Sequence, residues 1–250
     1  MRIAYIHGQN KGDTVYALQG CYAYPSVTYV TDEWNRSLIE FIISSTDVPV
    51  STGIFLPTIN STTIDKCKFS EERCYDEAQW RSRIGHFDKY VLCHKMISRD
   101  KHISLALNNS RTPRVIQTRG ITPKKSLNIV VAAETWNPAR QYLHWSDLNL
   151  NGSVELTTGM YSRNTLQEVV VVDNGDIATT VEIILGANLV VGVASFTAAL
   201  SASLGVPTIM FHATQTSLKT CGVSIFGGTD FLVSEHPRAV QQEIERRLGV

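Results

Sequence analysis

The segment Gly186–Phe211, GANLVVGVASFTAALSASLGVPTIMF, carries the clearest structural pattern in this sequence of 250 residues. An apolar run at Leu189–Val191 precedes small residues of helical pattern at Thr197–Leu204, and a second apolar run follows at Thr208–Phe211. Short strands that flank a helix in this way are typical of a parallel sheet covered by helices. The segment therefore predicts a strand–turn–helix–strand unit of an α/β protein.

The start of the expected helix carries glycine and hydroxyl residues. Ser195 and Thr197 stand at this start, and Gly192 precedes them. The first N–H groups of a helix have no acceptor inside it, and the helix dipole adds positive charge there. Such a helix start can bind a phosphate group. From the residues alone, a phosphate site and a well-packed core helix capped by Ser195 are equal alternatives.

Strands and helices alternate along both halves of the chain, which favours parallel sheets with helices on both faces. The polar stretch Asn108–Lys125 contains two prolines and a glycine and predicts a domain boundary. We expect two domains, residues 1–120 and 121–250, whose facing sheets leave a cleft at the carboxyl ends of their strands. Beyond the opening segment, strands are expected at Ile3–Ile6, Val27–Val30, Gly53–Leu56, Lys89–Cys93, Leu127–Ala132, Val154–Thr157 and Val169–Val172, and helices at Thr14–Cys21, Trp34–Ile43, Trp136–Leu148, Thr179–Leu185 and Arg238–Leu248.

Composition argues against several classes of protein. The 23 Lys and Arg residues balance 23 Asp and Glu residues, so no bulk attraction to nucleic acid or membrane follows. The stretch between Asp100 and Glu134 has basic residues and no acidic ones, which indicates a solvated linker or a basic rim facing an anionic ligand. Five scattered cysteines without a CxxC pair favour a reducing compartment over disulfides or a zinc site. With no signal peptide or membrane span in the sequence, we expect a soluble, cytoplasmic protein.

A polar turn, His7–Asp13, follows the first expected strand and ends in Gly12 and Asp13. Glycine lets the backbone approach a ligand closely. Asp13 could accept a proton from an attacking hydroxyl. Taken alone, however, a plain helix N-cap is the simpler interpretation of Asp13. The turn has neither the dinucleotide-binding glycine pattern nor a Walker loop.

Another polar group follows the expected strand Leu127–Ala132. It contains Glu134, Thr135 and Arg140. An arginine at the carboxyl end of a strand could hold a phosphate through charge-assisted hydrogen bonds, or it could simply be solvated. The sequence shows no Ser-His-Asp or Cys-His signature and no histidine spacing typical of a metal site, and His212 is an isolated candidate.

Together these features resemble the heptosyltransferase-like glycosyltransferases, family 9, which have the GT-B fold. Their C-terminal pattern A-x-L-V-V-G-x-D-S-G-x-x-H-L-A-A-A-L-G-x-P-T is similar to ANLVVGVASFTAALSASLGVPT in this chain. This chain departs from the pattern at three positions: Ala194 replaces Asp, Phe196 replaces Gly, and Ala199 replaces His. Weaker similarities follow the family's order at Gly12-Asp13, Ala23–Glu33 (AYPSVTYVTDE), Phe87–His94 (FDKYVLCH) and Arg140–Leu148 (RQYLHWSDL).

The resemblance implies an α/β GT-B fold of two Rossmann-like domains and a metal-independent, inverting glycosyltransferase. Such an enzyme moves a sugar from a nucleoside-diphosphate sugar to an acceptor hydroxyl, here of a glycan, and needs no cofactor besides the donor itself. In this reading Asp13 is the general base. The donor is expected to bind at Gly12, Glu134, Thr135, Arg140, Gly192, Ser195, Phe196 and Thr197.

Three other functions stay open at this point. A compact transferase could instead glycosylate a hydroxymethylated DNA base, as some phage enzymes do. The substitutions at Ala194 and Ala199 could mean a degenerate GT-B scaffold that binds a nucleotide or a partner. A nucleotide-sugar epimerase would share the fold but would need more acid and base residues than the sequence offers.

Overall fold

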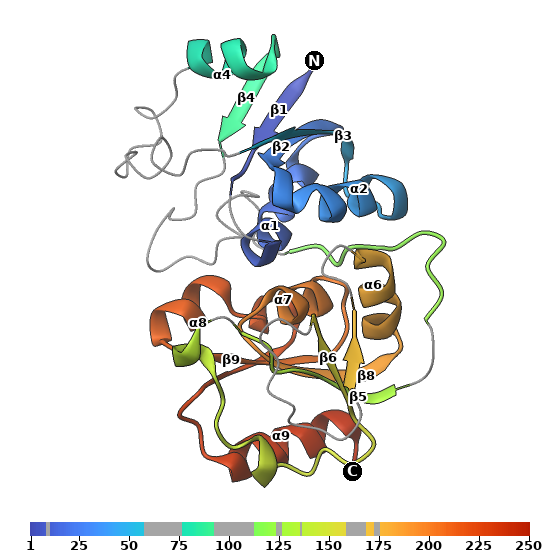
Figure 1. The fold of residues 1–250 in the computed structure, drawn as a ribbon, viewed down its shortest axis with the longest axis vertical. Helices are drawn as coiled ribbons and strands as arrows, with labels where there is room; N and C mark the ends of the chain where they lie inside the picture. Colours follow the sequence, from blue (N-terminus) through green and yellow to red (C-terminus); the bar gives the residue numbers. More distant parts are fainter. Residues whose placement is uncertain are drawn as a thin grey trace. The chain divides into compact units, whose positions relative to one another are not determined.

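The structure, a computed structural model, divides the chain into two compact units, Met1–Pro113 and Arg114–Val250, and each is described by itself (Figure 1). Each unit has a parallel sheet with helices, so the predicted α/β class is confirmed. Among the described residues, no helix is both long and apolar enough to cross a membrane. The structure describes residues 1–8, 11–57, 77–92, 113–123, 127–135, 137–158, 169–172 and 176–250.

The first unit has a sheet of four parallel strands in the order β3-β2-β1-β4. From the central β1 the chain proceeds to β2 and β3 on one side and later returns to β4 on the other. Ligands of open α/β sheets bind at the carboxyl ends of the two strands where the order reverses, here β1 and β4. The strands are β1 (Ile3–Ile6), β2 (Val27–Asp32), β3 (Val50–Leu56) and β4 (Lys89–Leu92).

Side chains of β1 alternate between the two faces of this sheet, as the pleat requires. Ala4 and Ile6 pack in a cluster with Trp80 of α4, whereas the Tyr5 hydroxyl donates to the Ala17 carbonyl of α1 at 2.9 Å. Both faces of the sheet are therefore covered. The helical segments are α1 (Lys11–Ala17), η1 (Leu18–Ala23), η2 (Glu33–Asn35), α2 (Arg36–Ser45) and α4 (Glu77–Ile84).

The second unit has six parallel strands in the order β10-β9-β8-β5-β6-β7. The chain proceeds from β5 to β6 and β7 on one side and then crosses to β8, β9 and β10 on the other. The order therefore reverses between β5 and β8, which pair directly through Ala132 and Gly192. The strands are β5 (Leu127–Ala132), β6 (Val154–Thr157), β7 (Val169–Val171), β8 (Ala187–Val193), β9 (Thr208–His212) and β10 (Thr229–Leu232).

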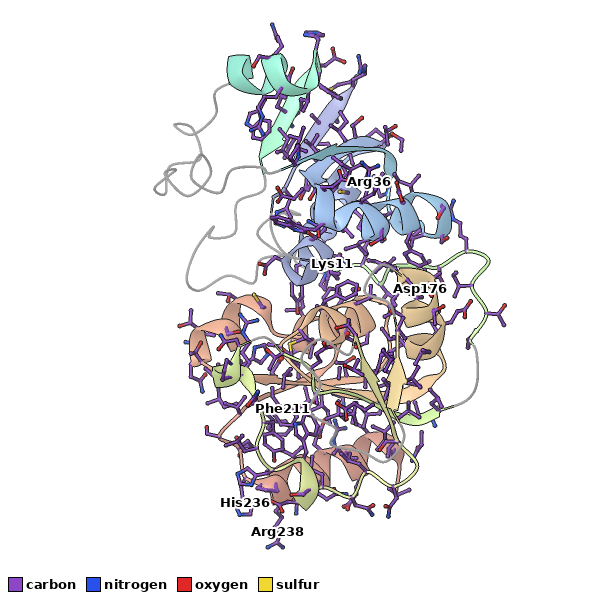
Figure 2. The ribbon with its side chains drawn as sticks, viewed as in Figure 1. Lys11, Arg36, Asp176, Phe211, His236 and Arg238 are labelled. Atoms are coloured by element: carbon purple, nitrogen blue, oxygen red, sulfur yellow. The ribbon has the colours of Figure 1, made fainter. Side chains whose placement is uncertain are left out.

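Helices cover both faces of this larger sheet, with α6 and α7 on one side and α9 on the other (Figure 1). The α9 face holds a core in which Val191, Val193 and Phe211 pack with Val240 and Ile244 of that helix. Figure 2 shows Phe211 inside the unit, surrounded by other side chains. The helices are α6 (Ile177–Leu185), α7 (Phe196–Ser203), α8 (Gln215–Cys221) and α9 (Pro237–Leu248), together with the short η5 (Ser224–Phe226).

The helix expected at Trp136–Leu148 is wrong. Two short 3-10 helices, η3 (Pro138–Arg140) and η4 (Trp145–Asp147), occupy the described part of this segment, and Trp136 lies outside it. Between them the backbone is extended at Gln141, and the Tyr142 ring stacks on Phe211 with centroids 4.1 Å apart. Packing of the Tyr142 ring against the sheet therefore outweighs local helical propensity here.

The division between the units differs from the boundary expected after residue 120. The Ile116 N–H donates to the Ser203 carbonyl of α7 at 2.7 Å, which attaches this stretch to the second unit. Within the basic stretch between Asp100 and Glu134, the structure describes residues 113–123 and 127–133, so Lys101, Arg111, Lys124 and Lys125 lie outside the described residues.

Candidate functional site

The carboxyl ends of β5 and β8 bring together predicted site residues of the second unit. Arg140 follows β5 through η3, and its Nη1 donates to the Ala194 carbonyl, at the end of β8, at 3.2 Å. Arg140 is half-buried. A guanidinium group is therefore held at the turn between β8 and α7, where the strand order reverses.

The helix expected at Thr197–Leu204 is present as α7, Phe196–Ser203. Ser195 is the N-cap with extended backbone (φ −142°, ψ 173°), and its hydroxyl accepts from the Ala198 N–H at 3.5 Å. The preceding N–H groups, of Phe196 and Thr197, have no acceptor within the helix because it begins there. Both residues are half-buried. The turn thus presents two backbone donors, two hydroxyls and, through Arg140, a cation.

Gly192 is explained by strand packing. It pairs with Ala132 of β5, and a Cβ at Gly192 would lie 2.8 Å from both the Ala132 Cβ and the Ala132 carbonyl oxygen. Real Cβ atoms do not approach other atoms so closely. Glycine therefore lets β8 approach β5, and this packing sets the position of the turn that follows.

Glu134 and Thr135 lie at the same edge, at the end of β5. The Glu134 carboxylate accepts from the Thr157 hydroxyl at 3.1 Å and from the Thr158 N–H at 2.6 Å. The Thr135 hydroxyl accepts from the Asn137 N–H at 3.2 Å. Glu134 thus joins the end of β5 to the end of β6, and both residues shape the edge of the site through contacts within the protein.

In the first unit, Gly12 and Asp13 lie in the first turn of α1, after the end of β1. The helix begins at Lys11, so Asp13 is its third residue and not its N-cap. Only 9% of Asp13 is exposed. A carboxylate in the first turn is stabilised by the positive end of the helix dipole. Asp13 therefore lies near the carboxyl edge of its sheet, beside the reversal of strand order at β1.

A polar network that no sequence pattern reveals surrounds His212, the last residue of β9. Its Nε2 lies 2.7 Å from Oδ1 of Asp230, and its Nδ1 lies 3.1 Å from the Ser217 hydroxyl. Asp230 belongs to β10, a four-residue strand whose sequence TDFL gives no clear alternating pattern. The contact between His212 and Asp230 could not be predicted, because it depends on the pairing register of β9 and β10.

Burial alone would raise the pKa of Asp230. The hydrogen bond with His212 and those donated by the backbone N–H groups of Val223 and Ser224 outweigh burial and hold the pKa below its usual range. The described part of the chain contains no group of three or more His, Cys, Asp or Glu residues that could hold a metal. Of the five cysteines, Cys21 and Cys221 are present as thiols, and Cys67, Cys74 and Cys93 lie outside the described residues.

No family model and no curated protein matches this sequence. Solved structures match nearly all of it. E. coli heptosyltransferase WaaC with ADP has a TM-score of 0.63 and 15% identity, covering 99% of this chain and 100% of its own. E. coli ADP-heptose LPS heptosyltransferase II has a TM-score of 0.66 and 12% identity, covering 99% and 98%. The family 9 glycosyltransferase from Veillonella parvula has a TM-score of 0.62 and 12% identity, covering 98% and 90%.

The order of strands in both sheets and these matches define an α/β protein of the GT-B class. Within that class, the chain has the fold of the heptosyltransferases, as its sequence resemblance implied. Identities of 12% to 15% establish the shared fold alone. The activity must be argued from the site.

Proposed function

We propose that this protein is a glycosyltransferase that moves a sugar from a nucleoside-diphosphate sugar to an acceptor hydroxyl, with inversion and without a metal ion. The observation that carries the proposal is the contact between Arg140 and the Ala194 carbonyl. It holds a cation beside the start of α7, at the point where the strand order reverses. A diphosphate is the donor group that such an arrangement fits best.

The donor diphosphate would bind at the start of α7. The N–H groups of Phe196 and Thr197 would donate to phosphate oxygens, together with the hydroxyls of Ser195 and Thr197. Arg140 would add charge-assisted hydrogen bonds. As the bond between the sugar and the diphosphate breaks, negative charge grows on the leaving phosphate, and these fixed donors stabilise that charge. No metal ion is required in this scheme.

Asp13 would serve as the general base. The acceptor hydroxyl would give its proton to the Asp13 carboxylate while its oxygen attacks the anomeric carbon from the face opposite the diphosphate. The new C–O bond forms as the bond to the phosphate oxygen breaks, so the anomeric centre inverts and the nucleoside diphosphate leaves. The burial of Asp13 would limit competition from water.

Structural neighbours add support for a nucleotide-sugar donor. WaaC has been solved with ADP and with ADP-2-deoxy-2-fluoro heptose. The same class of donor is proposed for this chain, but not the same sugar. Phe196 places an aromatic side chain at the helix start where the family pattern has glycine, and Ala194 removes a carboxylate there. Both changes alter the surface that a donor sugar would meet.

A second candidate function rests on the same two substitutions and on Ala199. A GT-B scaffold that binds a nucleoside diphosphate without turnover would retain Arg140 and the start of α7 but would not need the family's acidic residue and histidine. The alternative of a modified DNA base as acceptor depended on basic residues of which Lys101, Arg111, Lys124 and Lys125 lie outside the described residues. We therefore do not propose it.

The release of nucleoside diphosphate from a panel of nucleotide-sugars tests the proposal. ADP-, UDP-, GDP- and dTDP-sugars would be incubated with the protein and with mixed glycan acceptors. We expect release from one nucleotide class, with the sugar recovered in inverted linkage on an acceptor. Tight nucleotide binding with no release from any donor would favour the non-catalytic scaffold instead.

A further inference from the structure

The network of His212, Asp230 and Ser217 lies inside the second unit and does not belong to the proposed donor contacts. The His212 side chain is fully buried, and the Asp230 side chain is 4% exposed. The three residues come from β9, β10 and α8 in turn. A buried polar network fixes one arrangement of these elements only if each polar group is satisfied.

The hydrogen bonds around Asp230 indicate that Nε2 of His212 carries a proton. The Asp230 carboxylate accepts from the Val223 N–H and the Ser224 N–H, each at 2.9 Å, as an ionised carboxylate does. Nε2 of His212 must therefore donate to this carboxylate, which leaves Nδ1 facing the Ser217 hydroxyl. Every nitrogen of the ring is then satisfied, and the ring has one favoured orientation.

The end of β9 is in turn bonded to the turn that begins the proposed donor site. The Ala194 N–H donates to the Phe211 carbonyl at 2.8 Å, one residue before His212. On the other side of Ala194, its carbonyl accepts from Arg140. The position of Ala194, and with it the start of α7, therefore depends on where β9 ends.

We infer that His212, Asp230 and Ser217 are positioning residues for the start of α7. By fixing the end of β9 against β10 and α8, they hold the Phe211–Ala194 hydrogen bond and so aim the N–H groups of Phe196 and Thr197. None of the three side chains needs to touch the substrate. The inference rests on the proposed function for its consequence in donor binding, but its structural part can be tested without any ligand.

A second network in the same unit supplies a matched control. Glu243 of α9 accepts from the Thr229 hydroxyl of β10 at 2.5 Å and from Arg247 at 2.9 Å. It ties β10 to α9 on the opposite face of the sheet and has no bond to β9 or to the Ala194 turn among the described residues. Asp230→Asn and Glu243→Gln both replace a hydrogen-bonded carboxylate with an amide, one in β10 and the other in the helix bonded to it.

The test measures hydrogen exchange at the Ala194 amide in both variants and in Ser217→Ala, with no ligand present. We expect exchange at Ala194 to rise by about 10-fold or more in Asp230→Asn and by less in Ser217→Ala, because local opening free energies set exchange rates. Glu243→Gln should leave the Ala194 amide protected from exchange, even if this variant loses as much melting temperature as Asp230→Asn. Equal protection of Ala194 in all variants, or equal loss in Glu243→Gln, would overturn the inference.

A titration with the nucleoside diphosphate that binds the wild type best gives the second readout. Asp230→Asn should raise the dissociation constant of this nucleotide by about 10-fold, and Glu243→Gln should leave the constant unchanged. Should Asp230→Asn fail to fold, Ser217→Ala carries both measurements, and unchanged exchange together with unchanged affinity in that variant would refute the inference. If the wild type binds no nucleotide, the proposed function fails while the exchange result still decides the positioning role.

Discussion

At the scale of single residues, the side chains of the second unit that are proposed to bind the donor differ in their contacts from those that shape the site. Arg140 and the start of α7 present donors, whereas Gly192 and Glu134 shape the edge through close packing and hydrogen bonds. A sequence pattern cannot separate these two roles, because both place small or polar residues after a strand. The contact distances and hydrogen-bond partners of these residues distinguish the two roles.

Gly192→Ala is expected to destabilise the second unit. The added Cβ would overlap Ala132 at 2.8 Å, and backbone on both strands would have to move. Overpacking of this kind costs about 1–3 kcal/mol. Urea denaturation would measure the loss, with Ala198→Gly as a comparison that removes a buried methyl group from the neighbouring helix. A Gly192→Ala variant as stable as the wild type would show that the strands can separate at no cost.

Arg140→Ala should weaken nucleoside-diphosphate binding by about 10- to 100-fold, since a hydrogen bond to a charged group contributes about 1.5–3 kcal/mol. Arg140→Lys should recover only part of this, because lysine lacks the planar fork of donors. Arg238→Ala is the control: this exposed arginine stands at the start of α9 and points away from the unit (Figure 2). Calorimetric titration measures all three. Equal affinity of Arg140→Ala and wild type would remove Arg140 from the site.

At the scale of helices and strands, the patterns that could be read from the sequence were the apolar ones. Short apolar runs predict the strands β1, β5 and β6 with the ends that the structure shows, and they predict β8 and β9 with ends that differ by one or two residues. The elements α8 and β10 were not predicted because Gln215–Cys221 is mostly polar and the β10 sequence, TDFL, carries a charged residue and gives no clear alternating pattern. The His212 network could not be predicted for the same reason, since its partners Ser217 and Asp230 come from those two elements.

The junction between α9 and β10 should respond to acid. The hydrogen bond from Arg246 makes the largest contribution to the lowered pKa of Glu243. Burial raises this pKa, but further hydrogen bonds from Thr229 and Arg247 lower it, and the result is a pKa of about 2. Because the pKa of Glu243 is lower in the folded state than its ordinary value of 4.5, ionised Glu243 stabilises the fold at pH values above 4.5. This stabilisation is lost as the pH falls from 4.5 toward 2. Glu243→Gln should therefore lower the free energy of unfolding at pH 7.

Denaturation curves of wild type and Glu243→Gln between pH 7 and pH 2 check this. The difference between the two free energies of unfolding should shrink steadily below about pH 4.5. A difference that is constant over this range, or one that grows in acid, would contradict the assigned ion pairs.

At the scale of the whole molecule, both units put their predicted reactive groups at a reversal of strand order. Asp13 follows β1 in the first unit, and Arg140 and Ser195 follow β5 and β8 in the second. The GT-B class could be recognised from the sequence because the segment Gly186–Phe211 keeps most of the family's pattern. The donor sugar could not, because the pattern changes at Ala194 and Phe196, in the turn proposed to meet the diphosphate, and at Ala199 inside α7.

The two units should contribute separable steps. Asp13→Asn is expected to lower sugar transfer by about 100-fold or more, the range of general acid–base catalysis, because the amide cannot take up the acceptor proton. Donor affinity should stay within a factor of about 2 of the wild type, since the donor groups belong to the second unit. Single-turnover transfer and donor titration measure the two effects. Unchanged transfer in Asp13→Asn would exclude Asp13 as the base.

A thermal-shift titration across nucleoside diphosphates tests the central claim most directly. A ligand that binds only the folded protein stabilises it by about 2.7 kcal/mol at 100 times its dissociation constant. We predict that one nucleoside diphosphate raises the melting temperature of the wild type and of Asp13→Asn equally, and that Arg140→Ala loses most of this shift. No shift with any nucleoside diphosphate or nucleotide-sugar, or an undiminished shift in Arg140→Ala, would contradict a donor site at the start of α7.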